Sequence, residues 1–308
     1  MTRSEPLSPL KAEIRSFANR LEKLRRLYMT WLVIAVGIAS FGVTFGLLYL
    51  NPEGINLRYT VIGGALVPSA LIYVLLSRLY GARGSVKLID SLCEASGFEH
   101  HPDGCFGMKV ANKHKILPKH NKSILENGLL GIISGTEVAL QEVVLTELRQ
   151  DPDHEKKDKE FLRFWGLLVR IQLPRKLQGH SVIIPRATMK TFFSSDFSQY
   201  QEIKMNGTTR FEKVYEVVSL DAVEARLAIN GAFKESFIAA GDALQAYWAE
   251  GSLKEGELML AFQRFRPYIS LPPLWKPVEE AALRHYAEEL ESIARIVRAL
   301  QSNSQLGL

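Results

Sequence analysis

The stretch LRFWGLLVRIQL, residues 162–173, decides the fold class, because its apolar residues recur at every second position. One face carries Trp165, Leu167, Val169, Ile171 and Leu173, and the other carries Gly166, Leu168, Arg170 and Gln172. The earlier stretch EVALQEVVLTEL, residues 137–148, is also apolar and rich in β-branched residues. A fully polar segment, residues 151–160, lies between them, so we predict a long β-hairpin with a polar tip.

Outward from this hairpin, the sequence predicts further strands at residues 179–185, 211–218, 256–262 and 266–271, of which the last two form a closing pair. It predicts helices at residues 86–96 and 232–250; in the longer one, one side carries Phe233, Phe237, Leu244 and Trp248. Strands joined by hairpins, with helices grouped between and after them, indicate an α+β domain with a mainly antiparallel sheet and packed helices. We place this domain at residues 84–272.

Two apolar segments precede the domain. MTWLVIAVGIASFGVTFGLLYL, residues 29–50, and YTVIGGALVPSALIYVLLS, residues 59–77, contain no charged residue. As helices they would extend over about 33 and 28 Å, close to the thickness of about 30 Å of a bilayer core. Neither has the polar stripe of a soluble helix, and a signal peptide would not be followed at once by a second span. We therefore predict a transmembrane helical hairpin at residues 29–80.

The distribution of cations predicts the orientation of this hairpin. Residues 1–28 carry seven cations, the connecting loop 51–58 carries only Arg58, and Arg78, Arg83 and Lys87 follow the second span. The positive-inside rule then places both termini in the cytoplasm. Residues 1–28 also supply +4 of the net charge of +5. The basic character therefore indicates attraction to anionic lipid, and we expect no nucleic-acid partner.

Both ends of the chain carry an apolar stripe at helical spacing. The N-terminal segment, residues 1–28, predicts a basic amphipathic helix, and the C-terminal segment, residues 273–308, predicts a second amphipathic helix and a tail. We expect each stripe to pack on its own domain or on lipid; contact between the two stripes, or self-association through them, is the alternative. The stripes are Leu10, Ile14, Phe17, Leu21, Leu24 and Tyr28, and Leu283, Tyr286, Leu290, Ile293, Val297 and Leu300.

Small residues recur four positions apart in both predicted spans. Gly42 and Gly46 form one pair, and Ala65 and Ser69 form another. Such pairs let helices approach closely, so we expect them to pack the two spans against each other, with a homodimer contact as the second choice.

Cysteine and histidine gather between residues 93 and 120. The candidates for a metal site are Cys93, His100, His101 and Cys105, with His114 and His120 nearby. Thiolate and imidazole are the ligands that zinc prefers. However, the spacing lacks the close pairs typical of zinc sites, so whether this cluster binds metal stays open.

The stretch KVYEVVSLDAVEARLAINGAF, residues 213–233, places Asp221, Glu224 and Arg226 close together. These charges suggest an active site at first. Their spacing is also that of a capping box, with Asp221 as the N-cap of a helix and Glu224 as its N3 partner. We favour the structural interpretation, which leaves Arg226 without a role.

The motifs FWGLLVRIQLPRKLQGHSVIIP, residues 164–185, and FEKVYEVVSLDAVEARLAINGAF, residues 211–233, resemble the bacterial membrane-protein family known as domain of unknown function 3137. The earlier stretch ILPKHNK, residues 116–122, resembles another strand of that family. The resemblance extends over about residues 110–270. It implies a protein of the bacterial inner membrane with two N-terminal spans and a cytoplasmic domain, and it brings no established activity.

The sequence contains no P-loop, no dinucleotide-binding glycine motif, and no metalloprotease or nucleophile-elbow motif. We therefore expect a non-enzymatic, membrane-anchored binding or scaffolding module without a cofactor. Its expected partners are the lipid bilayer and a membrane protein or a second copy of the chain. One alternative is a membrane-tethered enzyme, such as a metal-dependent hydrolase that uses the cluster at 93–120. Another is a binder of a lipid or small ligand.

Overall fold

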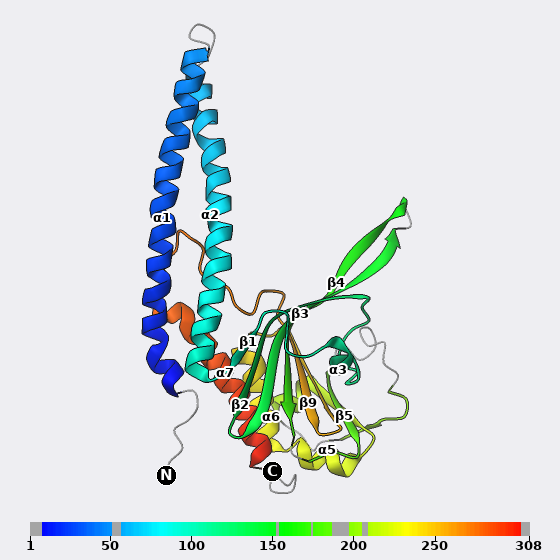
Figure 1. Ribbon diagram of the computed structural model, residues 1–308. Coiled ribbons are helices and arrows are strands. Elements are labelled where there is room, and N and C mark those ends of the chain that lie inside the picture. The colour runs from blue at the N-terminus through cyan, green and yellow to red at the C-terminus, as the bar shows by residue number, and fades with distance from the viewer. Residues whose placement is uncertain are drawn as a thin grey trace. The chain divides into compact units, whose positions relative to one another are not determined.

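The computed structural model describes residues 8–50, 57–151, 154–173, 175–186, 197–204 and 209–302. The chain divides into two compact units. The sheet unit contains residues 1–11, 92–268 and 285–308, and the hairpin unit contains residues 12–91 and 269–284. Figure 1 shows the elements of both.

An antiparallel sheet forms the body of the sheet unit and contains nine strands within the described residues. Its strands lie in the order β1-β2-β3-β4-β9-β8-β5-β7-β6. This confirms the α+β fold class with a large antiparallel sheet. The strands are β1 (Glu99–His101), β2 (Lys122–Ile133), β3 (Thr136–Asp151), β4 (His154–Gln172), β5 (His180–Pro185), β6 (Gln201–Glu202), β7 (Tyr215–Ser219), β8 (Trp248–Lys254) and β9 (Glu257–Gln263).

The predicted long hairpin is formed by β3 and β4, which pair from Val138↔Ile171 to Asp151↔His154. Beyond the sheet the two strands continue as an arm, which Figure 1 shows projecting from the other strands. Inside the sheet, Leu168 and Val169 are both fully buried, although they point to opposite faces. The reason is that β4 lies in the middle of the sheet, with other elements covering both of its faces.

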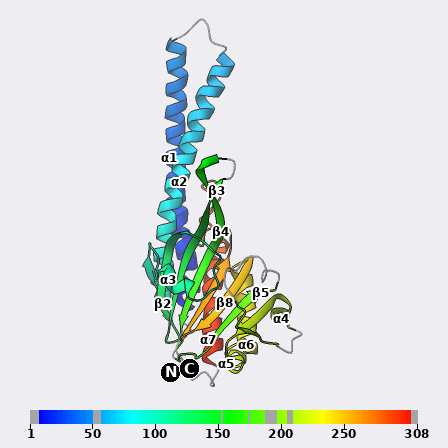
Figure 2. The same cartoon turned by 90° about the vertical axis from the view of Figure 1, so that its right-hand side faces the viewer.

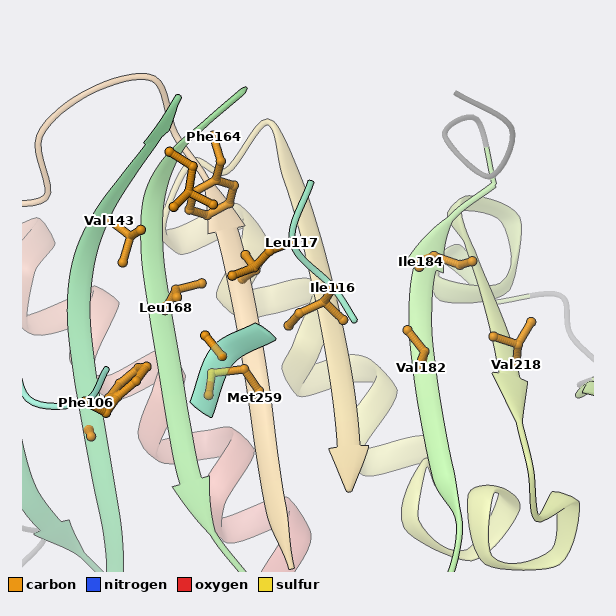
Figure 3. Close-up of a cluster of buried hydrophobic side chains, with 14 residues drawn as sticks. Phe106, Ile116, Leu117, Val143, Phe164, Leu168, Val182, Ile184, Val218 and Met259 are labelled. Carbon is orange, nitrogen blue, oxygen red and sulfur yellow. The ribbon is translucent and has the colours of Figure 1, made fainter. Parts of the chain in front are cut away.

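One face is covered by α3 (Met108–Asn112) and the loop that follows it. Figure 3 shows Phe106, Ile116 and Leu117 packed over the strand residues Leu168 and Met259 in a buried cluster. On the opposite face lie α6 (Gly231–Ala243) and α7 (Glu280–Gln301), visible behind the strands in Figure 3. Figure 2 shows α6 from the side, next to α4 (Arg210–Val214) and α5 (Ala222–Ala228).

Three boundaries in this unit differ from the sequence-based expectation. Residues 211–214 are helical, because Thr209 and Glu212 form a capping box that begins α4, and the strand starts only at Tyr215. The predicted helix at 232–250 ends at Ala243, and residues 248–254 form β8 instead. β8 is the partner of β9, so the prediction of a strand at residues 266–271 was wrong.

The hairpin unit contains most of the two long helices α1 (Ser8–Leu50) and α2 (Leu57–Ser96) and the segment 269–284. α2 continues through Pro68, and residues 86–96 belong to α2 and not to a separate helix. At its base, Tyr28, Tyr80 and Leu274 form a small buried cluster. Further along, the large apolar side chains of both helices are exposed, including Val33, Ile38, Phe41 and Phe45 on α1 and Val67, Leu71, Val74 and Leu75 on α2.

Among the described residues, one helix is long and apolar enough to cross a membrane, and it runs over residues 13–46 of α1. Part of the second predicted span, residues 59–65, lies among residues whose side chains are not described, so the second span stays a prediction.

The packing role of the glycines of the first predicted span stays a prediction. A Cβ atom added to Gly42 or Gly46 would have no other described atom within 4 Å. The side chains of residues 57–65 of α2 are not among those described. Ala65 lies outside the residues whose side chains are described, and Ser69 is half-buried.

The two amphipathic stripes are largely buried. On α1, Ile14, Phe17, Leu21 and Tyr28 are buried, Leu24 is partly buried, and the side chain of Leu10 is not among those described. On α7 the whole predicted stripe is buried, from Leu283 to Leu300. This burial favours packing within the chain over self-association through the stripes.

Candidate functional site

A chain of polar side chains crosses the interior of the sheet unit. It starts at Tyr200, near β6, and passes through His180 on β5 and Ser252 on β8 to His114, which follows α3. It ends at Glu257, the first residue of β9. The distances along the chain are 2.7 Å from the Tyr200 hydroxyl to His180 Nδ1, 2.9 Å from His180 Nε2 to Ser252 Oγ, 2.9 Å from Ser252 Oγ to His114 Nδ1 and 3.3 Å from His114 Nε2 to Glu257 Oε2.

The carboxylate at one end fixes the direction of every hydrogen bond in this chain. Glu257 can only accept, so His114 donates from Nε2 and accepts on Nδ1. Ser252 therefore donates to His114 and accepts from Nε2 of His180. His180 then accepts on Nδ1 from the hydroxyl of Tyr200. Each donor has one acceptor, so the chain is satisfied from end to end.

Two cations hold the carboxylate end. Lys113 Nζ lies 2.6 Å from Oε2 of Glu257, and Arg170 on β4 donates to Oε1 from Nε at 2.9 Å and from NH2 at 2.6 Å. Burial acts to raise the pKa of Glu257, but the hydrogen bonds from Lys113 and Arg170 outweigh it and lower the pKa to about 2. The residue is therefore an anion at neutral pH.

The two histidines are neutral. Burial lowers the pKa of His114 to about 4 and also lowers the pKa of His180 to about 4. Both values lie far below neutrality, so neither ring carries a charge in the cell. This agrees with the direction of donors and acceptors, because a charged imidazole could accept no hydrogen bond.

Ser252, His114 and Glu257 have the residue types of a catalytic triad, but the geometry does not support nucleophilic catalysis. Ser252 is fully buried, so no substrate carbonyl can approach its Oγ. Transfer of a proton along the chain is also unfavourable. Burial raises the pKa of Tyr200 above its ordinary value, whereas the pKa of Glu257 is lowered to about 2, so the carboxylate is far too weak a base to take a proton from the phenol. The network therefore acts as a structural connection between β4, β5, β8, β9 and the α3 loop.

A second polar group is buried beneath α7. NH2 of Arg264, which follows β9, donates to Oε1 of Glu289 on α7 at 2.8 Å, and both side chains are almost completely buried. Within the described part of the chain, Nε and NH1 of Arg264 and Oε2 of Glu289 have no hydrogen-bond partner. Burial raises the pKa of Glu289 to about 7, despite the nearby guanidinium. This pair is only partly satisfied, in contrast to the chain at His114.

The predicted corner at residues 221–226 has a structural role. Asp221 is the N-cap of α5 and accepts hydrogen bonds from the backbone N–H groups of Val223 and Glu224. Glu224 does not complete a capping box, because its carboxylate instead accepts from the N–H groups of Gln178 and Gly179, at 3.0 and 2.7 Å. It thereby fixes the loop that leads into β5. Arg226 is exposed in the last turn of α5, where its charge lies at the carbonyl end of the helix.

The candidate metal ligands are not brought together. In the part of the chain that the structure describes, no three His, Cys, Asp or Glu side chains could hold a metal ion between them. Cys93 is buried near the end of α2, and His100 and His101 lie on β1. Cys105 Sγ donates to the carbonyl of Leu140 at 3.3 Å, and burial raises the pKa of its thiol to about 11, so it is no thiolate nucleophile.

The two other histidines near this cluster also have protein partners. His114 belongs to the buried chain described above, and His120 donates from Nδ1 to the carbonyl of Pro118 at 2.9 Å. These residues are close in the sequence, but α2, β1 and the α3 loop carry them to different places in the described structure.

A cavity of about 370 Å³ lies between α4 and α6. Its apolar lining includes Phe211, Ile238 and Ala239. The salt bridge between Arg210 and Asp242, with NH2 and Oδ1 2.8 Å apart, forms part of its wall. The cavity is of a size that could take a small ligand or a single apolar side chain of a partner.

The sequence interpretation missed His180, Ser252 and Glu257. One signal was present: Glu257 begins the stretch ELMLAF, residues 257–262, which is otherwise apolar enough for the core. A polar residue in such a strand must find a partner when buried. Which partner it finds depends on strand order, and the order β4-β9-β8-β5 could not be derived from the pattern.

Three comparisons with known proteins show what this chain resembles. The model of a family described as Protein of unknown function (DUF3137) matches residues 162–302 and confirms the resemblance read from the sequence. No curated protein matches the chain. Among solved structures, the crystal structure of the mycobacterial trehalose monomycolate transport factor A is similar at 12% identity, over 71% of this chain and 97% of that one, with a TM-score of 0.37.

Proposed function

We propose that this chain, whose residues 162–302 match the DUF3137 family model, is a membrane-anchored binding or scaffolding module of the bacterial inner membrane. Two spans would hold it in the bilayer, and both termini and the sheet unit would lie in the cytoplasm. The module would bind a membrane protein or a second copy of the chain and would carry out no chemistry itself.

One observation carries the proposal. Large apolar side chains are exposed along both helices of the hairpin unit, on α1 at residues 31–49 and on α2 at residues 66–79. A soluble protein rarely exposes a contiguous apolar surface of this extent. Lipid tails would cover it, and the backbone polar groups of both helices are already satisfied within the helices.

The distribution of charge supports the orientation. The cations of residues 1–28 and the group Arg78, Arg83 and Lys87 lie outside the apolar parts of the two helices, and the loop between them carries only Arg58. Cations favour the cytoplasmic side of a span.

A matched pair of substitutions tests the membrane assignment. Ile38 on α1 and Val223 on α5 are both 69% exposed. We expect Ile38→Arg to cost about 3 kcal/mol of membrane insertion, because the residue would face hydrocarbon. Val223→Arg should change stability by less than about 0.5 kcal/mol, because its surroundings are aqueous. The fraction of protein that resists alkaline extraction from membranes measures the difference, and equal behaviour of the two variants would contradict the proposal.

A labelling experiment tests the two-span topology. In a chain with Cys93→Ala and Cys105→Ala, a cysteine introduced at Asn51 should react in intact spheroplasts with a maleimide that cannot cross membranes. A cysteine introduced at Val223 should react only after the membrane is opened. Reaction of both positions, or of neither, in intact spheroplasts would contradict the hairpin with cytoplasmic termini.

The binding role is tested by photo-crosslinking in cells. The apolar stripes of α1 and α7 are buried, so partner contacts are expected on exposed residues of the sheet unit. A photo-reactive amino acid at Val223, Tyr247 or Ile132, three widely separated exposed positions in the sequence, should give a discrete adduct at one of them and not at all three. No adduct at any position would count against a scaffold.

A further inference from the structure

The segment 269–279 of the hairpin unit is fixed tightly to the base of α1 and α2. NH1 of Arg25 donates to the carbonyl of Leu274 at 3.0 Å, and the N–H of Val278 donates to Oε2 of Glu22 at 3.0 Å. Leu274 is buried with Tyr28 and Tyr80. We call this segment the strap; Figure 1 shows it in orange beside the two helices.

The pair that holds the strap keeps its charge over the whole physiological pH range. Hydrogen bonds from Arg25 are the main reason that the pKa of Glu22 is lowered to about 2. The strap also packs closely against α2 at Gly84, where an added Cβ atom would overlap the side chain of Leu271. The strap is therefore positioned by contacts on both sides of residue 275.

Trp275 nevertheless points outward and is 65% exposed. A turn closed by the hydrogen bond from Lys276 N to Pro273 O, 2.8 Å, holds it in place, and its ring lies beside Tyr73 of α2 with 5.9 Å between centroids. A rigidly held, exposed tryptophan has a large apolar surface that water solvates poorly. The adjacent Lys276 and Pro277 are also exposed.

The place of Trp275 along the helices indicates what covers it. Tyr73 lies five residues before Arg78, where the charged part of α2 begins, and exposed Trp31 lies five residues after Arg26 on α1. Each aromatic residue thus lies about 7.5 Å along its helix from a cation, in the direction of the apolar part of that helix. Tryptophan and tyrosine are enriched at this boundary, where headgroups meet acyl chains.

We infer that the strap is an interfacial anchor, which inserts Trp275 into the headgroup layer of the cytoplasmic leaflet and offers Lys276 to lipid phosphates. The inference rests on the proposed membrane function. It adds a third attachment to the two spans, made by a segment that is far from both in the sequence. Such an anchor would couple the chain between β9 and α7 directly to the lipid surface.

Spin labels at three exposed positions test the anchor separately from the spans. In the Cys93→Ala, Cys105→Ala chain, a nitroxide is attached at Trp275→Cys, at Phe41→Cys or at Val223→Cys, and each protein is placed in vesicles of phosphatidylethanolamine and phosphatidylglycerol. Collisions with oxygen report the acyl chains, and collisions with a water-soluble nickel complex report water. Residue 41 should favour oxygen, residue 223 should favour nickel, and residue 275 should lie between them.

The outcomes distinguish the anchor from the membrane assignment. If residue 275 behaves like residue 223 while residue 41 favours oxygen, the spans stand and the anchor is wrong. If residues 41 and 223 behave alike, the membrane assignment itself fails. All three native residues are exposed, so the labels should not disturb folding. As a second measurement in a Trp31→Phe background, Trp275→Ser should abolish most of the fluorescence quenching that lipids labelled at the headgroup cause.

Discussion

The two units of this chain depart in opposite ways from the rule that apolar side chains lie inside and polar ones outside. The hairpin unit exposes large apolar residues along both helices, whereas the sheet unit buries a chain of polar residues from His180 to Glu257 and an ion pair between Arg264 and Glu289. The proposed bilayer would account for the first departure, because lipid tails solvate apolar side chains and water does not. The burial of polar residues is explained by their hydrogen-bond partners. It is fully compensated only where every donor has an acceptor.

The difference between the two buried polar groups is instructive. The His114 chain is satisfied at every step, and its carboxylate is held by Lys113 and Arg170. The Arg264–Glu289 pair makes one hydrogen bond and leaves other polar atoms without a partner among the described residues. We therefore expect the hydrogen-bonded side chains around His114 to help define the fold. For the Arg264–Glu289 pair we expect a large loss of unfolding free energy when one member is removed, because the other charge is then buried alone.

The largest effect is expected for Glu289→Leu. This change leaves the guanidinium of Arg264 buried without an acid, and arginine cannot lose its proton to adapt. The expected loss is about 3–5 kcal/mol of unfolding free energy, measured by chemical denaturation of the full chain in detergent. Arg264→Met should cost less, because Glu289, whose pKa is already about 7, can become neutral. The double variant should be close to the wild type; a double variant as unstable as Glu289→Leu would show that the pair itself is required.

The pH dependence of stability tests the satisfied chain. His180 has a pKa of about 4 in the folded protein and about 6.5 when unfolded, so the unfolded state takes up a proton first. Its contribution is fully present above pH 6.5 and is lost as the pH falls toward 4. Between pH 7 and pH 5 one such histidine should cost about 2 kcal/mol of unfolding free energy.

The control for this measurement is His180→Gln, in which an amide can still donate to Ser252. Burial raises the pKa of Glu250 and of Glu289, and these groups act in the opposite direction because they favour folding at lower pH. They are the same in both proteins and cancel in the difference. The wild type should therefore lose about 2 kcal/mol relative to the variant between pH 7 and pH 5. If unfolding free energy depended on pH in the same way in the wild type and in His180→Gln, His180 would not be held neutral by the fold.

Elements with a strong local pattern could be predicted from the sequence. The long hairpin β3–β4 followed from alternation, and the buried stripe of α7 followed from helical spacing. The prediction of a strand at residues 266–271 was wrong, because β9 pairs instead with β8, to which it is joined by a tight turn at residues 255–256. The buried chain joins His114, His180 and Ser252 from three separate elements, and no local pattern connects them. Neighbouring cysteines and histidines suggested a metal site instead, although only tertiary structure decides which of them meet.

The smallest effect is expected at the surface corner, where Asp221 caps α5 with hydrogen bonds of 2.9 and 3.0 Å to the N–H groups of Val223 and Glu224. Asp221→Ala should cost about 1 kcal/mol of unfolding free energy, and Asp221→Asn, which can still accept both bonds, only a few tenths. Asp221 makes two hydrogen bonds and Glu289 one, yet the loss at Glu289 should be several times larger. After Asp221→Ala, water can reach and solvate the N–H groups that lose their acceptor. After Glu289→Leu, water cannot reach Arg264 to replace the carboxylate. If denaturation gave the same loss for Asp221→Ala and Glu289→Leu, burial would not be what separates the two sites, and the corner at residues 221–226 would have a role beyond capping.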